Sequence, residues 1–427
     1  MWQFETDPEF QKTLDWIDCF VREEVEPLEL VLDNPYDLAH PLFERLVRPL
    51  QAEVKQRGLW ACHLSPKLGG PGMGQLKLAL MSEKFGRARF GPIVFGAQAP
   101  DTGNSEILAH YGTEEQKKSY LEPLLANRIV SCFTMTEPQG GADPLGMTTS
   151  AMLDGDQWVI NGEKWFASNA RFASFYIVMA VTDPDAAPHA QMSMFIVPAD
   201  TPGIEIVKDY GYLGEPDKAH AHLRWTDVRV PADAMLGGRG KAFEVAQVRL
   251  SGGRMHHAMR ALAQATHCFE QMCERVLSRS TKGELLARKQ MVQEKLADSW
   301  IQLRQFRLLI LETAWLHDRE SDWSRLRKNV AAVKVLMPKV LHDIAERALH
   351  LHGSLGVTDE APFADALIHS YTLGLADGPT EVHKVTVARE ILKGVEPCAT
   401  MFPDYLRSHA KARAIAKFGL EAEAGVP

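Results

Sequence analysis

The stretch DGDQWVINGEKWFASN, residues 154–169, brings β-type sequence into a chain that is otherwise helical in pattern. Asp154-Gly155 and Asn161-Gly162 are dipeptides typical of hairpin turns. Short runs of β-branched and aromatic residues, such as Trp158-Val159-Ile160, lie beside these turns. Similar runs continue along the chain, so residues from about 131 to 237 are predicted to form a β domain, either a small barrel or a sandwich.

Helical periodicity lies on both sides of this segment. Asp7-Pro8 is a plausible helix start, and Thr113 is a candidate helix cap. Apolar residues at three- and four-residue spacing predict helices over 41–58, 75–85 and 104–111, and later over 242–278, 284–319, 323–351 and 381–393. Gly353 is expected to end the third of the long helices. Four such helices suggest a bundle.

The sequence therefore predicts a mainly α protein with a central β domain. Its expected parts are an N-terminal helical domain over 1–131, a middle β domain over 132–240, a C-terminal four-helix bundle over 241–400 and a loose tail over 401–427.

Composition excludes several classes of protein. With 45% hydrophobic and 24% charged residues, the chain has an ordinary core-forming composition. A net charge of -8 argues against a broad nucleic-acid-binding surface. The six cysteines include no C-x-x-C pair, which indicates a reducing compartment. The start of the chain does not resemble a targeting peptide, and no stretch approaches the ~20 apolar residues of a membrane span. We expect a cytoplasmic protein.

A glycine-rich turn follows the start of the predicted β domain. The segment CFTMTEPQGGADP, residues 132–144, contains Thr134 and Thr136 and then Gly140-Gly141. Backbone N–H groups in such a turn can bind an anion such as a pyrophosphate, and the threonines can hydrogen-bond a polar ring edge. Taken alone, such a segment is more often a plain loop between domains.

A second segment, KWFASN at 164–169, places Phe166 two positions before Ser168. The aromatic ring can stack on a planar cofactor while the serine hydroxyl bonds a ring nitrogen. An aromatic residue in a strand is also common in protein cores, so this segment does not decide the matter by itself.

Asp377 lies in the segment LADGPTEVH, residues 375–383, among small and apolar residues and before a predicted helix. A carboxylate held in an apolar pocket has a raised pKa, which suits a general base. Aspartate is also common as a turn residue or a helix cap, and local sequence alone favours that role.

Arg249 lies in the segment QVRLSGGRMHH, residues 247–257, whose arginines and histidines can border a charged ligand. His256 and His257 are adjacent, so they cannot face one metal ion from the same side of a helix. His350 and His352 are no better spaced. We expect no metal site.

Together, these segments resemble the acyl-CoA dehydrogenase family over about residues 5–395. The segments TEP at 136–138, NGEKWF at 161–166 and HGSLGV at 352–357 are similar to motifs of the family. ADGP at 376–379 lies where many members carry a catalytic Glu-Gly-Thr segment.

Three segments are similar to one branch of the family, in which the base is aspartate. They are APDTGN at 99–104, GRMHH at 253–257 and ADGP at 376–379. In some relatives a glutamate at the position of Val248 serves as an alternative base, and that route is closed here. The resemblance therefore makes Asp377 the expected base.

The resemblance implies a middle β-barrel between two helical domains, bound FAD, and a homotetramer or homodimer that shares FAD across a subunit interface. Positions that match flavin or pyrophosphate contacts are Phe133, Met135, Thr136, Gly141, Ala142, Phe166 and Ser168. Positions that match contacts to the FAD of a neighbouring subunit are Arg279, Gln290 and Gly353. Arg249 and Gly378 match positions near the substrate.

Some of these positions depart from the family pattern. Phe166 replaces a more usual tryptophan, which should preserve stacking. Ala142 replaces a more usual serine, so only its backbone N–H can bind the phosphate. Lys282 lies where many members have phenylalanine, which puts that interface contact in doubt.

The implied reaction is the α,β-dehydrogenation of an acyl-CoA to a trans-2-enoyl-CoA. Asp377 would remove the α-proton, flavin N5 would accept the β-hydride, and the N–H of Gly378 would hydrogen-bond the thioester carbonyl. An electron-transfer flavoprotein is the expected electron acceptor. The alternatives are an oxidase of the same fold, acting on acyl-CoA or on nitroalkanes, and a flavin-free homologue without catalytic activity.

Overall fold

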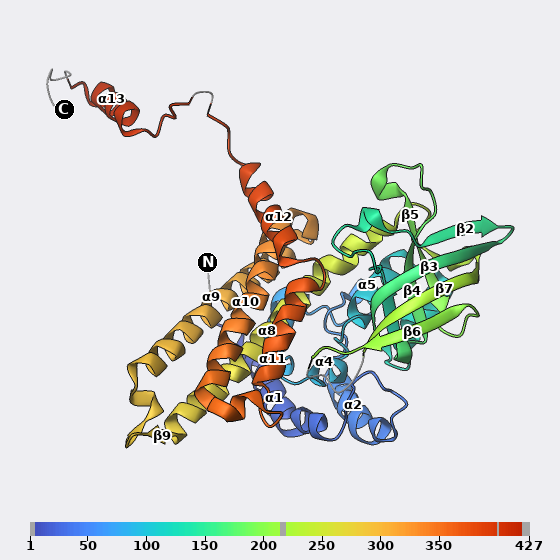
Figure 1. The fold of residues 1–427 in the computed structure, drawn as a ribbon, viewed down its shortest axis with the longest axis horizontal. Coiled ribbons are helices and arrows are strands. Elements are labelled where there is room, and N and C mark those ends of the chain that lie inside the picture. The colour runs from blue at the N-terminus through green and yellow to red at the C-terminus, as the bar shows by residue number, and fades with distance from the viewer. Residues whose placement is uncertain (1–4, 214–218, 399–400, 421–427) are drawn as a thin grey trace.

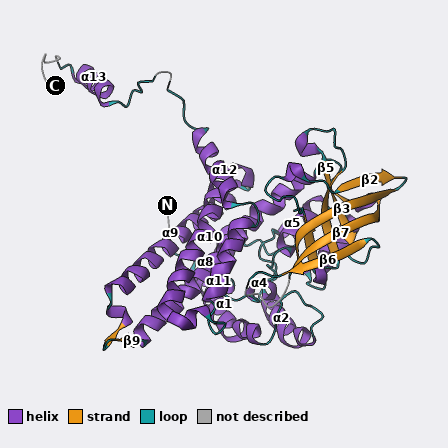
Figure 2. Cartoon of the chain, viewed as in Figure 1, coloured by secondary structure: helices purple, strands orange, loops and turns teal. Residues whose placement is uncertain are grey.

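The computed structural model describes residues 5–213, 219–398 and 401–420. Figure 1 shows three parts: N-terminal helices, a sheet, and long C-terminal helices. Figure 2 shows that nearly all the strands belong to this one sheet, beside the helical remainder of the chain. The mainly α fold with a central β domain is confirmed.

The N-terminal part is built from short helices whose starts follow from local sequence. The helix α1 begins after Asp7, whose side chain accepts hydrogen bonds from the N–H groups of Glu9 and Phe10. Thr113 forms a capping box with Gln116, as its sequence position predicts. The helices are α1 (Pro8–Phe20), α2 (Arg48–Gln56), α3 (Gly74–Phe85), α4 (Gly91–Val94), α5 (Asp101–Tyr111), α6 (Glu114–Gln116) and α7 (Glu122–Leu125).

The sheet has eight strands in the order β6-β7-β3-β2-β4-β5-β8, and β1 pairs in parallel with β4. The strands are β1 (Ser131–Thr134), β2 (Ser150–Asp154), β3 (Gln157–Ser168), β4 (Phe175–Val181), β5 (Met192–Pro198), β6 (Ile204–Tyr210), β7 (His220–Pro231) and β8 (Met235–Leu236). The Asp154-Gly155 turn joins β2 to β3 as predicted, since Asp154 pairs with Gln157.

The predicted turn at Asn161-Gly162 is wrong, because β3 continues through it. The dipeptide marks a shift in the register between β3 and β7. Asn161 exchanges two hydrogen bonds with Asp227 across this shift. Gly162 has a φ of 143°, and a Cβ there would lie 2.6 Å from the Oγ1 atom of Thr149. The glycine serves a close approach of two backbones instead of a reversal of the chain.

The strand β4, in the middle of the sheet, is buried on both faces. Phe175, Ile177 and Met179 of β4 belong to a core shared with α5 and α8. The alternating residues Tyr176 and Val178 belong to a second core inside the β domain. The alternation of β4 thus fixes the sheet against the helices that carry the site.

The C-terminal part consists of α8 (Ala242–Ser278), α9 (Gln290–Glu320), α10 (Arg327–His352), α11 (Phe363–Leu375) and α12 (Thr380–Leu392). Gly353 ends α10 with a φ of 66°, as predicted. The N-terminal helices and these long helices share one large hydrophobic core.

Three predictions from the sequence need correction in this part of the chain. The predicted helix over 284–319 begins only at Gln290, because β9 (Ser280–Thr281) and β10 (Glu284–Leu285) form a small hairpin before it. The helix α11 was not predicted, although it packs against α10. The expected loose tail contains α13 (Arg407–Phe418), none of whose residues is buried, while residues 421–427 lie outside the described part.

Candidate active site

A cavity of about 780 Å³ lies between the β domain and the C-terminal helices. Its walls come from β1 and the turn after it, from β3, and from α8, α10, α11 and α12. This volume is within the range typical of sites for small molecules and cofactors. The predicted residues that line it are Phe133, Met135, Thr136, Gly141, Ala142, Phe166, Ser168, Arg249, Asp377 and Gly378.

A buried ion pair holds the glycine-rich turn against β3. Lys164 Nζ lies 2.8 Å from Glu137 Oε1 and donates a hydrogen bond to the carbonyl oxygen of Met135. Glu137 also accepts hydrogen bonds from the backbone N–H groups of Thr148 and Thr149. Burial would raise the pKa of Glu137, but the attraction of Lys164 and these hydrogen bonds outweigh it and lower the pKa to about 2. Sequence reasoning assigned no role to Glu137 or Lys164.

Gly141 has no room for a side chain. A Cβ at Gly141 would lie 2.9 Å from the Cγ2 atom of Thr136 and 3.1 Å from its Oγ1 atom. At the neighbouring Gly140 a Cβ would meet nothing within 4 Å. The threonine therefore packs directly on the backbone at Gly141, where the cavity wall exposes main-chain atoms.

The aromatic pair on β3 presents a ring to the cavity. Phe166 is 42% exposed and has a φ of 51°, which is uncommon for a non-glycine residue. Its neighbour Trp165 also lines the cavity, and its buried Nε1 atom has no hydrogen-bond partner within the described part of the chain. Ser168 Oγ lies 3.0 Å from Nδ1 of His220, a partner that the sequence did not indicate.

Asp377 lies in the short connection between α11 and α12. Asp377 has a φ of 55° and Gly378 a φ of 99°, so two successive residues adopt left-handed conformations. The carbonyl oxygen of Asp377 accepts a hydrogen bond from Arg254 Nε at 3.1 Å and lies 3.2 Å from His383 Nε2. These contacts fix the backbone, and the carboxylate remains 16% exposed in the cavity.

The prediction that apolar surroundings raise the pKa of Asp377 is wrong. Burial does raise its pKa, but His257, Arg249, Arg254 and Lys334 lower it, and the net shift is downward. His257 Nε2 lies 3.5 Å from Asp377 Oδ2, and burial lowers the pKa of His257 to about 3. The positive charge near Asp377 at neutral pH thus comes from the arginines and the lysine, and it keeps the aspartate ionised.

Arg249 extends from α8 toward the same cavity. Its guanidinium lies 4.0 Å above the ring of Phe133, and its Nε donates a hydrogen bond to Asn104 Oδ1 at 2.9 Å. Asn104 belongs to the segment 99–104, which the sequence singled out without giving it a task.

Three predicted residues lie away from the cavity. Arg279 follows the end of α8, Gln290 begins α9, and Gly353 follows α10. Arg275 donates a hydrogen bond to the carbonyl oxygen of His352, which brings the ends of α8 and α10 together. These residues therefore group at helix ends outside the cavity lining.

The cavity fits a flavin by the chemistry of its walls. Among the residues that the structure describes, the buried Nε1 of Trp165 has no hydrogen-bond partner. The Gly141 backbone carries no side chain, and the Phe166 ring is open for stacking. A planar, polar-edged ring system with a pyrophosphate matches these three features. Within the described residues, no group of three His, Cys, Asp or Glu side chains is placed to hold a metal ion.

Comparison with known proteins identifies the family. Three family models match the chain: the acyl-CoA dehydrogenase N-terminal domain over 7–128, the middle domain over 132–228 and the C-terminal domain over 240–392. The chain belongs to the acyl-CoA dehydrogenase family, whose members bind FAD and are oxidoreductases.

Individual relatives agree with this assignment. The chain is 39% identical over 391 residues to acyl-CoA dehydrogenase family member 11 of Gallus gallus, covering 89% of this chain but only 50% of that protein. It is 39% identical over 349 residues to the probable acyl-CoA dehydrogenase FadE2 of Mycobacterium tuberculosis, covering 81% and 85% of the two chains. A putative acyl-CoA dehydrogenase from Mycobacterium abscessus superimposes with a TM-score of 0.84 at 36% identity, over 92% of this chain and 100% of the other.

No helix in the described part of the chain has both the length and the apolar character needed to cross a bilayer.

Proposed function

We propose that this protein dehydrogenates an acyl-CoA thioester between its α and β carbons, with Asp377 as the base and a trans-2-enoyl-CoA as product. The observation that carries the proposal is the position of Asp377. An ionised carboxylate on a fixed backbone lies in the wall of a cavity whose other wall offers an exposed ring and a bare glycine turn.

The residues of this chain would divide the work among them. Phe133, Met135, Thr136, Gly141, Ala142, Phe166 and Ser168 would hold FAD, which supplies the acceptor for two electrons when bound. Asp377 would take the α-proton onto its carboxylate. The N–H of Gly378 would donate a hydrogen bond to the thioester carbonyl and so stabilise the developing enolate.

The cationic surroundings of Asp377 set the character of this base. They favour the ionised form, so the carboxylate is ready to accept a proton at neutral pH. A base with a low pKa has a weak drive to take a proton from an ordinary thioester α-carbon. The enolate must therefore be stabilised strongly, which assigns weight to the Gly378 N–H.

Asp377→Asn tests the assignment directly. The substitution keeps the side-chain volume and the backbone contacts, and it removes the proton acceptor. We expect kcat with acyl-CoA to fall by about 10²- to 10⁴-fold while the flavin absorbance of the purified protein is unchanged. Asp359→Asn, at an exposed turn, is the matched control and should keep full activity. Full activity of Asp377→Asn would reject Asp377 as the base.

We propose further that the electrons leave to an electron-transfer flavoprotein. The test is anaerobic reduction of the bound flavin by an acyl-CoA, followed by admission of air. Slow reoxidation by air together with fast reoxidation by an electron-transfer flavoprotein would support a dehydrogenase. Rapid reoxidation by air would instead identify an oxidase, and a purified protein that takes up no FAD would identify a non-catalytic homologue.

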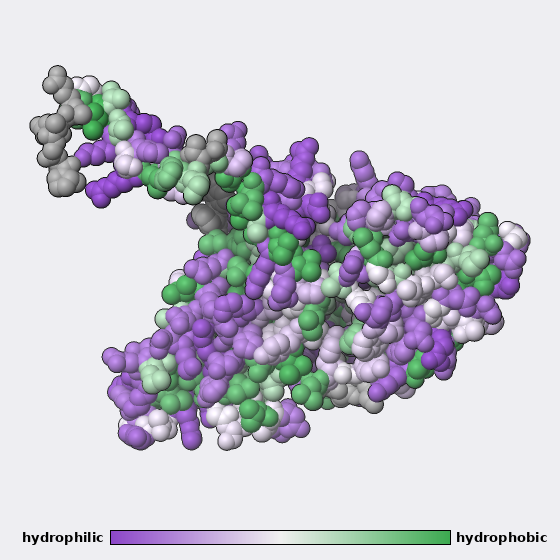
Figure 3. Space-filling model, turned by 45° about the horizontal axis from the view of Figure 1, so that its top comes forward, coloured by the Kyte–Doolittle hydropathy of each residue, from purple (hydrophilic) through white to green (hydrophobic). Residues whose placement is uncertain are grey.

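We also propose that the protein self-associates, as a homodimer or homotetramer, through its C-terminal helices. Large hydrophobic side chains are exposed there, among them Met291 and Trp300 of α9 at 75% and 56%. Figure 3 shows patches of hydrophobic residues among hydrophilic ones on the face of the helical part that is in view. Arg279, Gln290 and Gly353 lie at helix ends of the same part, where a neighbour's FAD would reach them.

Light scattering after size exclusion tests self-association. The wild-type protein should elute as a dimer or tetramer, and Trp300→Glu should shift it toward smaller species because it places a charge in the interface. Met152→Glu, a similar change at a 71% exposed position on β2, should have no effect. A monomeric wild-type protein would contradict the proposal.

A further inference from the structure

We propose that the segment Asp101–Asn104 at the start of α5 is a positioning element for Arg249, with Asn104 holding the arginine in the cavity wall beside Asp377. This inference rests on the proposed function in one respect, which is that Arg249 contributes to turnover. The contacts that carry it do not depend on any ligand.

A chain of buried hydrogen bonds leads from Asp101 to Arg249. The Asp101 carboxylate accepts hydrogen bonds from the backbone N–H of Ser131 at 2.9 Å and from its hydroxyl at 2.5 Å. Asn104 Nδ2 donates to Ser131 Oγ at 2.8 Å, and Asn104 Oδ1 accepts from Arg249 Nε at 2.9 Å. Asp101, Asn104 and Ser131 are at most 4% exposed.

The direction of each hydrogen bond in this chain is fixed. The Ser131 hydroxyl gives its one proton to the Asp101 carboxylate, so its oxygen is left to accept. The NH₂ group of Asn104 must then face Ser131, which turns the amide oxygen toward Arg249. No other orientation of the amide satisfies both neighbours, so Asp101 determines at a distance where the Arg249 Nε–H is held.

Gly103 makes the approach of Arg249 to α5 possible. A Cβ at Gly103 would lie 2.7 Å from the Cγ atom of Arg249. A glycine inside a helix costs about 0.5–1 kcal/mol relative to alanine, and α5 carries it at the point where the arginine stem crosses the helix. The glycine thus makes α5 less stable than an alanine would, and it leaves space for the side chain of Arg249.

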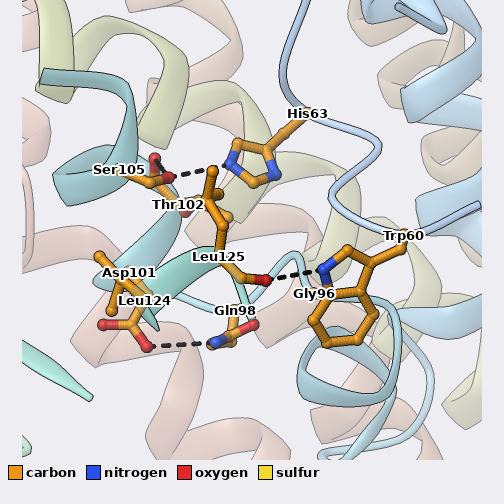
Figure 4. Close-up of a pocket in the computed structure, with 9 residues that line it drawn as sticks. All are labelled: Trp60, His63, Gly96, Gln98, Asp101, Thr102, Ser105, Leu124 and Leu125. Carbon is orange, nitrogen blue, oxygen red and sulfur yellow. Dashed lines mark hydrogen bonds between the residues drawn. The ribbon is translucent and has the colours of Figure 1, made fainter. Parts of the chain in front are cut away.

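Figure 4 shows the other side of Asp101, where Gln98 Nε2 donates to its second oxygen at 3.1 Å. The cavity on this side, which Trp60, His63 and Ser105 also line, has a volume of about 10 Å³. This is the space of one water molecule at most, so no substrate or cofactor can reach Asp101 from there. Asp101 therefore contacts only other residues of the protein, and its role is to orient them.

The acidic groups around Arg249 come from α5 and from the connection between α11 and α12. Asp101 and Glu106 lie on α5, and Asp377 lies between α11 and α12. Burial raises the pKa of Asp101 to about 6 and that of Glu106 to about 7, while Arg249 opposes both shifts. A guanidinium among several acidic groups can settle on more than one of them. The single hydrogen bond that Arg249 Nε donates to Asn104 Oδ1 selects the position over Phe133.

A double-mutant cycle tests the proposal. Asn104→Leu keeps the side-chain size but removes both hydrogen bonds, and Arg249→Met removes the group to be positioned. We expect Asn104→Leu to lower kcat/KM by about 10- to 10²-fold, because a small displacement of a site residue is costly. In the Arg249→Met background the same substitution should lower kcat/KM less than threefold, because there is no arginine to displace. Equal losses in both backgrounds would overturn the proposal.

The pH profile gives a readout that a merely structural role would not move. Displacing Arg249 takes a cation away from Asp377, so the acid limb of kcat/KM in Asn104→Leu should move to higher pH. The matched control is Gln51→Leu, which deletes a buried amide that bonds Ile93 and Asn127 far from Arg249. It should lower the melting temperature and leave the acid limb in place. An unmoved acid limb in Asn104→Leu would contradict the proposal.

Gly103→Ala perturbs the same arginine without touching a hydrogen-bonding group. In an ordinary helix this change raises stability, so a lower melting temperature together with a reduced kcat/KM would show that the added Cβ displaces Arg249. A higher melting temperature with unchanged kcat/KM would overturn the proposal. If Arg249→Met fails to fold, Arg249→Lys replaces it, because it keeps the charge and removes the Nε–H.

Thermal unfolding of the four proteins of the double-mutant cycle distinguishes a failure of this proposal from a failure of the proposed function. These are the wild-type protein, Asn104→Leu, Arg249→Met and the double variant. If the wild-type protein turns over no acyl-CoA but the melting temperatures show coupling between Asn104 and Arg249, the proposed function fails and the positioning stands. If the wild-type protein is active but the two substitutions are additive in both kcat/KM and melting temperature, the positioning fails and the proposed function stands.

Discussion

Lys164 Nζ lies 2.8 Å from Glu137 Oε1, and the two side chains are 0% and 1% exposed. The pair joins two segments that the sequence placed separately at the site, the turn after β1 and the strand β3. Through this pair the wall that would hold pyrophosphate and the ring that would stack on flavin are fixed to one another.

Breaking this pair should destabilise the protein strongly. Lys164→Met leaves the Glu137 carboxylate buried without its cation, and we expect the free energy of unfolding to fall by about 3–5 kcal/mol in urea denaturation. Arg229→Met breaks an exposed ion pair with Asp154 and should cost less than about 1 kcal/mol. Equal losses in the two variants would contradict a special role for the buried pair.

The same pair predicts how stability depends on pH. Because the folded state holds the pKa of Glu137 at about 2, below its ordinary value of 4.5, its ionisation stabilises the fold above pH 4.5. That stabilisation should be lost as the pH falls from 4.5 toward 2. Urea unfolding over this range should show a smaller loss in Glu137→Gln than in the wild-type protein, and identical slopes would argue against the shift.

Two adjacent glycines should respond differently to the same substitution. In Gly141→Ala the new Cβ meets Thr136, and relieving that contact costs about 1–3 kcal/mol, so we expect weaker FAD binding. In Gly140→Ala the Cβ enters open space, and FAD affinity should stay unchanged. Titration of the apoprotein with FAD, followed by flavin fluorescence, measures both. Equal affinities would mean that the turn adapts freely.

Phe166 should contribute to FAD affinity through its ring alone. Phe166→Ala removes the stacking surface and should weaken FAD binding by about 2- to 10-fold. Phe166→Trp keeps an aromatic ring and should bind FAD at least as tightly as the wild-type protein. An unchanged dissociation constant for Phe166→Ala in the same titration would place the flavin elsewhere.

The acid limb of kcat/KM should report the cations around Asp377. The pKa of Asp377 lies below its ordinary value of 3.8, so in the wild-type protein no acid limb from this group is expected above about pH 5. Arg254→Met removes one of the cations and should raise the limb into the measurable range. Arg254→Lys keeps the charge and should move it less. An acid limb that is the same in all three proteins would assign it to another group.

Features that depend on neighbours in sequence were predictable. The caps at Asp7 and Thr113, the turn at Asp154-Gly155 and the end of α10 at Gly353 all follow from contacts within four residues. The turn predicted at Asn161-Gly162 was wrong because the same dipeptide also occurs at a β-bulge, where here Thr149 packs on the glycine. The helix α11 was missed because its apolar residues leave little polar face to mark a helical period.

Features that depend on distant contacts were not predictable. The segment around Asp377 is apolar in sequence, but Arg249, Arg254 and Lys334 come from two other helices and reverse the expected pKa shift. The role of Asn104 is visible only once α5, β1 and α8 are packed together. The family resemblance predicted ten of the residues that line the cavity, and it did not predict the forces that hold them in place.

The walls of the cavity belong to different parts of the chain, with the glycine turn and Phe166 before residue 170 and Asp377 more than two hundred residues later. Neither fragment of a chain cut between the β domain and α8 would contain both the wall proposed to hold flavin and the proposed base. The two fragments should thus be inactive when separate and regain turnover only when they associate. Recovered activity would therefore measure how much of the fold has reassembled.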